Sequence, residues 1–65
     1  MDTVGFIGLG KMGGPVAEHI QAAGFPMIVF DVNESALGPF LRRGAQQAAS
    51  PAELAAHSDV IISAL

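Results

Sequence analysis

The chain lacks cysteine and the largest aromatic side chains and has few basic residues, which excludes several common kinds of binding site. It has 65 residues, with no cysteine, tryptophan or tyrosine, and three basic against six acidic residues. Without cysteine it can form neither a disulfide scaffold nor a thiolate metal site, and two histidines are too few for a metal cage. The acidic balance and the missing large aromatics argue against nucleic-acid binding, which favours a basic, aromatic surface.

The sequence also shows no membrane-spanning segment and no targeting signal. The longest stretch without a formal charge, residues 19–30, is shorter than the roughly 20 apolar residues that span a bilayer. The start of the chain, Met1-Asp2-Thr3, lacks the basic head of a secretory signal. A strand is expected almost at Met1 and leaves no room for a transit peptide. We therefore expect no membrane partner and a cytoplasmic location.

The hydrophobic content is high for so short a chain. Hydrophobic residues make up 51% of the sequence, which excludes intrinsic disorder. A lone domain of this size buries only about 60% of its unfolded surface and is marginally stable. Because the sequence also stops inside an apolar run, at Ala64-Leu65, we expect residues 1–65 to be a fragment of a larger domain. Contacts with further chain or with a second copy are then expected, the latter giving a homo-oligomer.

Short apolar runs alternate with helical patterns along the whole chain. Strands are expected at 3–7, 26–31, 45–48 and 60–65, and helices at 15–23, 33–43 and 51–57. Gly38-Pro39 interrupts the second helix and leaves 39–43 as its regular part. This alternation predicts an α/β fold, a partial Rossmann-like parallel sheet with strand order 3-2-1-4. Two helices would cover one face and one the other, with the fourth strand as an exposed apolar edge.

Side-chain spacing predicts how the first and third helices sit. Val16, Ile20 and Ala23 form an apolar stripe on the first helix, and Gln21 is expected to face away from it. The run Ser50-Pro51-Ala52-Glu53 matches a capping box with proline at the first helical position. This run predicts the start of the third helix.

A glycine-rich turn follows the first expected strand. Its pattern, Gly8-x-Gly10-x-x-Gly13, is weak evidence alone, but it lies between a strand and a helix. Asp31 ends the next expected strand, 18 residues after Gly13. These are the features of a dinucleotide-binding strand–helix–strand unit. The alternative is that the glycines only make a tight turn.

Each residue of the turn has a physical task in such a unit. Gly8 permits the tight turn, Gly10 lets a pyrophosphate approach the backbone, and Gly13 lets the helix pack closely on the strand. The N–H groups of Lys11 and Met12 would point at the phosphates, helped by the helix dipole. The side chain of Lys11 can either contact a phosphate or extend into solvent.

Asp31 bears on the choice of cofactor. Its carboxylate would accept hydrogen bonds from the adenosine ribose and would repel the 2′-phosphate of NADP. The next residue, Val32, offers no positive charge to that phosphate. Arg42 and Arg43 lie a helix away and are better explained as partners of a helix dipole. We therefore expect NAD, with NADP the less favoured cofactor.

Longer runs of residues carry a family resemblance along essentially the whole chain. The chain resembles the β-hydroxyacid dehydrogenase family, which includes 3-hydroxyisobutyrate dehydrogenase and tartronate semialdehyde reductase. The segment Gly8-Leu9-Gly10-Lys11-Met12-Gly13 is its most diagnostic part. The other matching runs are Ala23-Gly24-Phe25, Phe30-Asp31-Val32-Asn33, Gly44-Ala45, Ser50-Pro51-Ala52-Glu53 and Ser58-Asp59-Val60-Ile61-Ile62.

The resemblance implies an oxidoreductase that interconverts a β-hydroxyacid and its semialdehyde, with NAD as cofactor. In that family the catalytic lysine and a helical second domain lie beyond residue 65, so no catalytic residue is expected here. The cofactor-binding residues expected are Gly8, Leu9, Gly10, Lys11, Met12, Gly13, Asp31, Val32, Asn33 and Leu65. Two alternatives stay open: a flavoprotein or methyltransferase with a similar turn, and a non-catalytic NAD-sensing or assembly module.

Overall fold

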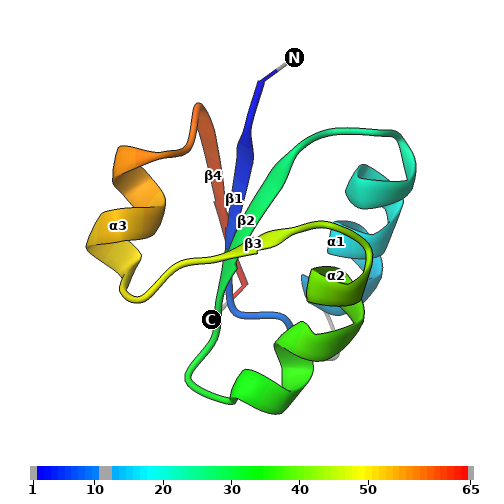
Figure 1. Cartoon of the computed structure of the whole chain (residues 1–65), viewed down its shortest axis with the longest axis horizontal. Coiled ribbons are helices and arrows are strands. Elements are labelled where there is room, and N and C mark those ends of the chain that lie inside the picture. The colour runs from blue at the N-terminus through cyan, green and yellow to red at the C-terminus, as the bar shows by residue number, and fades with distance from the viewer. Residues whose placement is uncertain (1, 11–12, 65) are drawn as a thin grey trace.

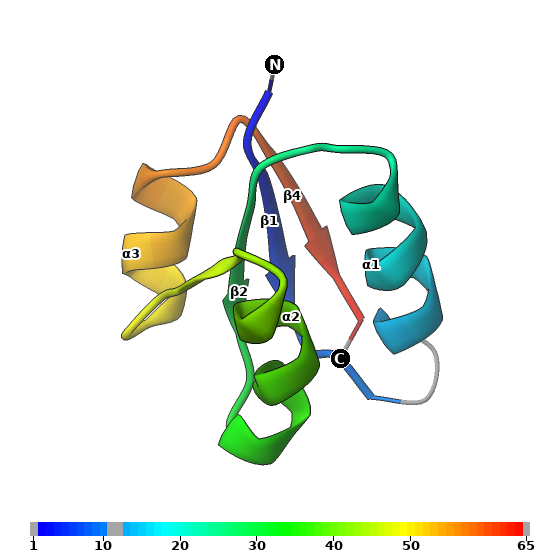
Figure 2. The same cartoon turned by 45° about the vertical axis from the view of Figure 1, so that its right-hand side comes forward.

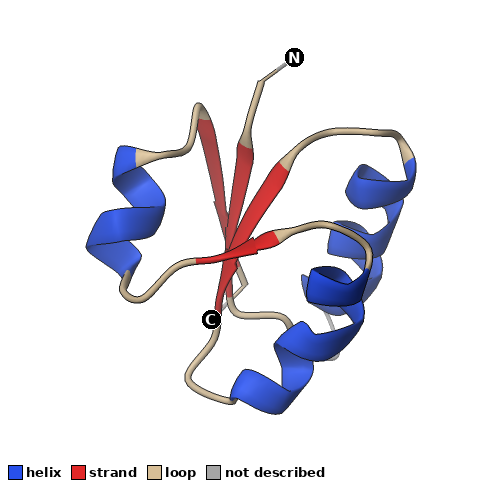
Figure 3. Cartoon of the chain, in the orientation of Figure 1, coloured by secondary structure: helices blue, strands red, loops and turns tan. Residues whose placement is uncertain are grey.

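The computed structural model describes residues 2–10 and 13–64, and strands and helices alternate along it (Figures 1 and 3). Lys11, Met12 and Leu65, three of the expected cofactor residues, lie outside the described residues. The elements in chain order are β1 (Val4–Ile7), α1 (Gly13–Ala22), β2 (Met27–Phe30), the 3-10 helix η1 (Glu34–Leu37), α2 (Gly38–Arg42), β3 (Gln46–Gln47), α3 (Pro51–Ala56) and β4 (Val60–Ser63).

The four strands form one parallel sheet with the order β3-β2-β1-β4, which confirms the order expected from the sequence. β1 is central, and Val4 pairs with Met27 on one side and Val60 on the other. Figure 2 shows α1 and α2 on one side of the sheet and α3 on the other. The expected distribution of the helices over the two faces is therefore also correct.

Alternation along the strands divides the core into two clusters. The larger cluster joins β1 and β2 to α1, η1 and α2, and consists of Val4, Phe6, Leu9, Ala17, Met27, Val29, Leu37 and Phe40. The smaller one lies under α3 and consists of Ile28, Ala48 and Leu54. Successive strand residues point to opposite faces, so the continuous apolar runs supply both clusters.

The buried side of α1 differs from the expected one. Val16 is 48% exposed, whereas Gly13 and Ala17, four residues apart, are buried, and Ile20 is half-buried. Gln21 is also half-buried, and its Nε2 donates to the Phe40 carbonyl oxygen at 3.0 Å. The expectation for Val16 and Gln21 was wrong because the small residues face the sheet and let the helix approach closely.

Several boundaries also differ from the expected ones. α1 begins at Gly13, two residues before the expected start, and the segment after β2 is a 3-10 turn followed by α2. β3 has two residues rather than four, and β4 ends at Ser63. The predicted start of α3 is confirmed, since the Ser50 Oγ accepts from the Glu53 N–H at 3.1 Å. The return bond of the capping box differs, because Glu53 Oε1 accepts from the N–H of Ala49, one residue before the N-cap.

Candidate cofactor-binding site

The carboxyl ends of β1, β2 and β4 meet at one edge of the sheet. The Gly8 N–H donates to the Phe30 carbonyl oxygen at 2.9 Å, and the Ala64 N–H donates to the Ile7 carbonyl oxygen at 2.9 Å. The glycine-rich turn between β1 and α1 begins at this edge. In open parallel sheets, ligands bind in the crevice outside the carboxyl ends of the strands.

The described glycines of the turn have three different environments. Gly8 has φ +87°, a conformation that side chains rarely adopt. A Cβ on Gly13 would lie 2.5 Å from the Gly8 carbonyl oxygen and 2.8 Å from the Ala64 Cβ. A Cβ on Gly10 would meet none of the described residues within 4 Å. The turn therefore needs glycine at 8 for its conformation and at 13 for close packing, while the space beside Gly10 is open.

Asp31 joins the end of β2 to this turn. Its Oδ2 accepts from the Leu9 N–H at 2.7 Å, and its Oδ1 accepts from the Asn33 N–H at 2.9 Å. These two hydrogen bonds, that of Leu9 first, lower the pKa of the Asp31 carboxyl below its usual value of 3.8. Asp31 is therefore ionised near neutral pH and stabilises the turn. A carboxylate has about four lone-pair sites, so further donors can still bind it.

The remaining expected residues lie around this carboxylate with different exposure. Leu9 is buried at 5% exposure in the larger core cluster, and its N–H is engaged by Asp31. Val32 is 89% exposed beside the site. The Asn33 Oδ1 caps η1, accepting from the Ser35 N–H at 3.2 Å and from its Oγ at 2.7 Å. Leu9 therefore contributes to the turn through packing.

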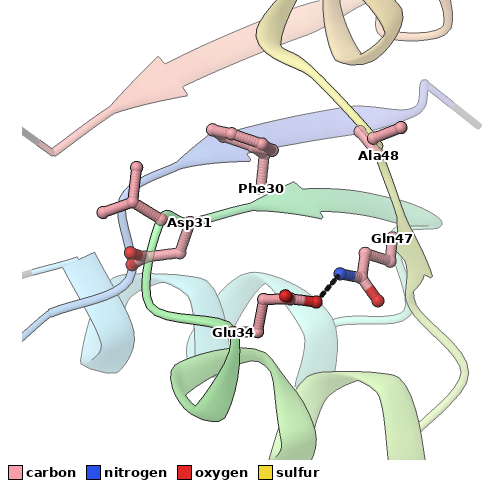
Figure 4. Close-up of a pocket in the computed structure, with 7 residues that line it drawn as sticks. Phe30, Asp31, Glu34, Gln47 and Ala48 are labelled. Carbon is pink, nitrogen blue, oxygen red and sulfur yellow. Dashed lines mark hydrogen bonds between the residues drawn. The ribbon is translucent and has the colours of Figure 1, made fainter.

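A cavity of about 550 Å³ opens beside Asp31 (Figure 4). Its size is within the range of sites for small ligands and cofactors. Glu34 and Gln47 face each other on its wall, with Gln47 Nε2 donating to Glu34 Oε1 at 3.1 Å. Sequence reasoning missed these two residues, because they come from η1 and β3, and the short third strand gave little signal. The cavity is lined by Phe30, Asp31, Val32, Glu34, Gln47, Ala48 and Ala49.

Charge is unevenly placed between the two ends of the sheet. The large cavity has two carboxylates on its wall, and none of the described residues that line it is basic. Arg43 instead lines a smaller cavity of about 230 Å³ with Gly24 and Pro26, at the opposite, amino end of β2. Arg43, the residue that follows α2, therefore lies at the end of the sheet opposite to Asp31.

Residues 2–10 and 13–64 contain neither a metal-binding cluster nor a membrane-spanning helix. Within them, no cluster of three or more histidine, cysteine or acidic residues is arranged to hold a metal ion. None of the helices in this part of the chain has the length and apolar character needed to span a membrane. His19 and His57 are both exposed.

The parallel sheet order, the glycine turn opening a helix and the acid at the end of β2 define a dinucleotide-binding type of α/β domain. The chain belongs to the family described as the NAD binding domain of 6-phosphogluconate dehydrogenase, whose model matches residues 3–65. A glycine pattern that only makes a tight turn does not account for a match of this length.

Individual relatives confirm the resemblance to the β-hydroxyacid dehydrogenase family. The chain is 47% identical over 62 residues to mitochondrial 3-hydroxyisobutyrate dehydrogenase of Mus musculus, covering 95% of this chain and 18% of the relative. It is 42% identical over 65 residues to 3-sulfolactaldehyde reductase of Escherichia coli, covering all of this chain and 22% of the relative. The match therefore concerns the segment that carries the glycine turn.

A solved structure agrees with the fold. The 3-hydroxyisobutyrate dehydrogenase of Mycobacterium tuberculosis superposes with a TM-score of 0.88 at 34% identity, over 100% of this chain and 22% of that one. Another structure of this fold, a reductive aminase of Aspergillus terreus with a TM-score of 0.88 at 26% identity, is a complex with NADPH. The chain thus spans about a fifth of the length of the relatives it matches, and the relatives named here are enzymes.

Proposed function

We propose that this chain is the NAD-binding portion of an oxidoreductase that interconverts a β-hydroxyacid and its semialdehyde. The proposal rests chiefly on one observation, the Asp31 carboxylate joined to the Leu9 N–H of the glycine turn. This bond joins the proposed ribose acceptor to the proposed phosphate-binding turn at one edge of the sheet. The names of the relatives support the reaction class.

The residues present suit a dinucleotide. The open space beside Gly10 leaves room for a pyrophosphate against the backbone, and the N-terminus of α1 favours an anion there. Gly8, Leu9 and Gly13 would shape that turn, with Lys11 and Met12 completing it. Asp31, Val32, Asn33 and Leu65 would border the adenosine and its ribose. The nicotinamide cofactor, when bound, supplies or accepts the hydride.

NAD is the proposed cofactor in preference to NADP. Asp31 is ionised, and two backbone N–H groups fix its carboxylate at the point where a ribose would lie. A 2′-phosphate would meet this negative charge with no basic residue among the described residues of the cavity wall. A neutral ribose hydroxyl instead donates to it.

The rest of the proposed enzyme lies outside this chain. Residues 1–65 would be the N-terminal part of a dinucleotide-binding domain, and a second, helical domain would supply a catalytic lysine. The isolated chain is then expected to show no dehydrogenase activity, and the enzyme is expected to be a cytoplasmic homo-oligomer. Velocity sedimentation and the location of a tagged full-length protein test these last two points, with a mitochondrial location as the contrary result.

The first experiment is a titration of this chain with NADH and NADPH, followed by nicotinamide fluorescence. The chain has no tryptophan or tyrosine, so its own emission scarcely interferes. We expect NADH to bind at least about tenfold more tightly than NADPH, a difference of about 1.4 kcal/mol. Tighter binding of NADPH would refute the role of Asp31 in cofactor choice. Binding of neither by the folded chain would refute a site that works within residues 1–65, and would leave the family membership standing.

The Gly10→Val variant tests whether the pyrophosphate binds against the backbone of the glycine turn. The side chain would enter open space, so the fold should persist while access of a phosphate to the backbone is blocked. We expect a loss of NADH binding of about tenfold or more, equivalent to about 1.4 kcal/mol. Unchanged affinity in a folded variant would place the pyrophosphate elsewhere.

A further inference from the structure

We infer that Glu34, held in place by Gln47, is a second determinant of cofactor choice, which excludes a 2′-phosphate from the cavity beside Asp31. This inference rests on the proposed function, because it concerns the same nucleotide site. It assigns a specificity role to a residue outside the glycine turn and outside the acid that ends β2.

The position of Glu34 is the first step of the argument. Glu34 and Asp31 line one cavity of about 550 Å³. A phosphate group bound in this cavity would therefore share it with both carboxylates. Charges at such short range repel each other, and added salt weakens that repulsion.

The hydrogen bonds of the two acids differ in kind. Both Asp31 oxygens accept charge-stabilising backbone N–H bonds, from Leu9 and Asn33. Among the described residues, the Glu34 side chain accepts one hydrogen bond, from the neutral side-chain amide of Gln47, at 3.1 Å. That bond fixes the Glu34 carboxylate on the cavity wall (Figure 4) and leaves its negative charge in place.

The two acids would therefore act differently on the cofactor. Asp31 both accepts from a ribose and stabilises the turn, so its replacement harms the binding of any dinucleotide. Glu34 makes no hydrogen bond to the described residues of the turn, 8–10 and 13, and its charge acts on an anion in the cavity. Removing that charge should relieve the repulsion of a 2′-phosphate while leaving the Leu9–Asp31 contact intact.

The test compares Glu34→Gln with Glu18→Gln, each of which removes one negative charge from an exposed position. Glu18 lies on α1 and does not line the cavity. Dissociation constants for NADH and NADPH are measured by nicotinamide fluorescence at low and high salt. We expect Glu34→Gln to bind NADPH about threefold to tenfold more tightly, with a smaller change for NADH. The gain should shrink at high salt, and Glu18→Gln should keep the wild-type ratio.

Gln47→Leu gives a second, independent readout. It keeps the charge of Glu34 but removes the amide that is hydrogen-bonded to it. The preference for NADH over NADPH should therefore fall by less in Gln47→Leu than in Glu34→Gln. Suppose that the wild type prefers NADH, but that the ratio of the NADPH and NADH dissociation constants is the same in Glu34→Gln and Glu18→Gln. Glu34 then has no role in cofactor choice, and the proposed function survives. If the wild type binds neither nucleotide, the site itself is wrong and this inference is wrong with it.

Discussion

The two faces of the sheet are covered to different extents. Toward α1 and α2, the residues Val4, Phe6, Met27 and Val29 are at most 6% exposed. Toward α3, Ile28 is 3% exposed, but Ile7 and Phe30 are only half-buried. The edge strand β4 is exposed on both faces, since Val60 and Ile61 are each 46% exposed. The candidate site lies where these faces meet, and its cavity is lined by Phe30, Ala48 and Ala49 from the less covered side.

This contrast shows that the two faces depend on different kinds of contact. The α1–α2 face is stabilised by a cluster of eight buried residues. The α3 face has three buried residues and depends on the close approach of α3 to Gly5 of β1. Ser58 Oγ, which would touch a Cβ at that position, also donates to the Leu54 carbonyl oxygen. A few close contacts therefore position the helix that borders the cavity.

The largest effect is expected from Gly5→Val, which breaks the α3 face. A Cβ on Gly5 would lie 2.2 Å from Ser58 Oγ and 2.6 Å from the buried Leu54 Cδ2. We expect a loss of more than about 4 kcal/mol in the free energy of unfolding, enough to unfold a chain of this size. Circular dichroism and an amide NMR spectrum would report it. Gly10→Val, which meets open space, is the control for folding, and retention of the fold in Gly5→Val would contradict the packing.

A matched pair of leucines tests the two faces directly. Leu37 belongs to the larger cluster and Leu54 to the smaller one, and they are 1% and 0% exposed. Leu37→Ala should cost about 3 kcal/mol and Leu54→Ala about 2 kcal/mol, because the thin α3 layer can collapse or admit water more easily. Urea denaturation measures both values. A larger loss for Leu54 would show that α3 is packed as rigidly as the opposite face.

The sequence was sufficient for most of the architecture and for the turn. The apolar runs, the positions of Gly8 and Gly13, and the capping box from Ser50 act through neighbours in the chain, so their patterns predict strands, turn and helix start. The buried face of α1 could not be predicted in this way, since Ala17 rather than Val16 faces the sheet. That choice depends on how closely the helix approaches the strands, which the spacing of apolar residues does not encode.

The candidate site could be predicted only where it is local. Asp31 and the glycines are found by their spacing, whereas the pairing of Glu34 with Gln47 joins residues 13 positions apart through a two-residue strand. The contact of Gly5 with Ser58 joins residues still further apart. Contacts of this kind depend on how elements distant in the chain pack in the final fold, and no motif marks them.

A smaller effect on stability is expected at Asp31 when the pH is lowered. Because hydrogen bonds from Leu9 and Asn33 lower the Asp31 pKa in the folded chain, ionised Asp31 stabilises the fold above its usual pKa of 3.8. That stabilisation is lost as the pH falls through the lowered folded pKa. Asp31→Asn should therefore be less stable by about 1 kcal/mol near neutral pH and equal to the wild type in strong acid. Urea denaturation as a function of pH would show this.

Glu18→Gln serves as the control for Asp31→Asn, since it removes a charge from the exposed surface of α1. Its stability should follow that of the wild type over the whole pH range. A difference between Asp31→Asn and the wild type that persists unchanged in strong acid would mean that the side-chain shape of Asp31, and not its charge, supports the turn.

The smallest effect is expected at Gln21, on the well-covered face. Its Nε2 donates to the Phe40 carbonyl oxygen, but that oxygen also accepts from the Ala45 N–H at 3.0 Å and the Arg43 N–H at 3.1 Å. The Gln21 Oε1 is buried and has no hydrogen-bond partner among residues 2–10 and 13–64, which costs stability. Gln21→Met keeps the length of the side chain, leaves the Phe40 oxygen satisfied and removes the unpaired acceptor. We expect a change within about 0.5 kcal/mol by urea denaturation. A loss above about 1 kcal/mol would mean that the side-chain amide itself joins α1 to α2, and that this face too depends on a single polar contact.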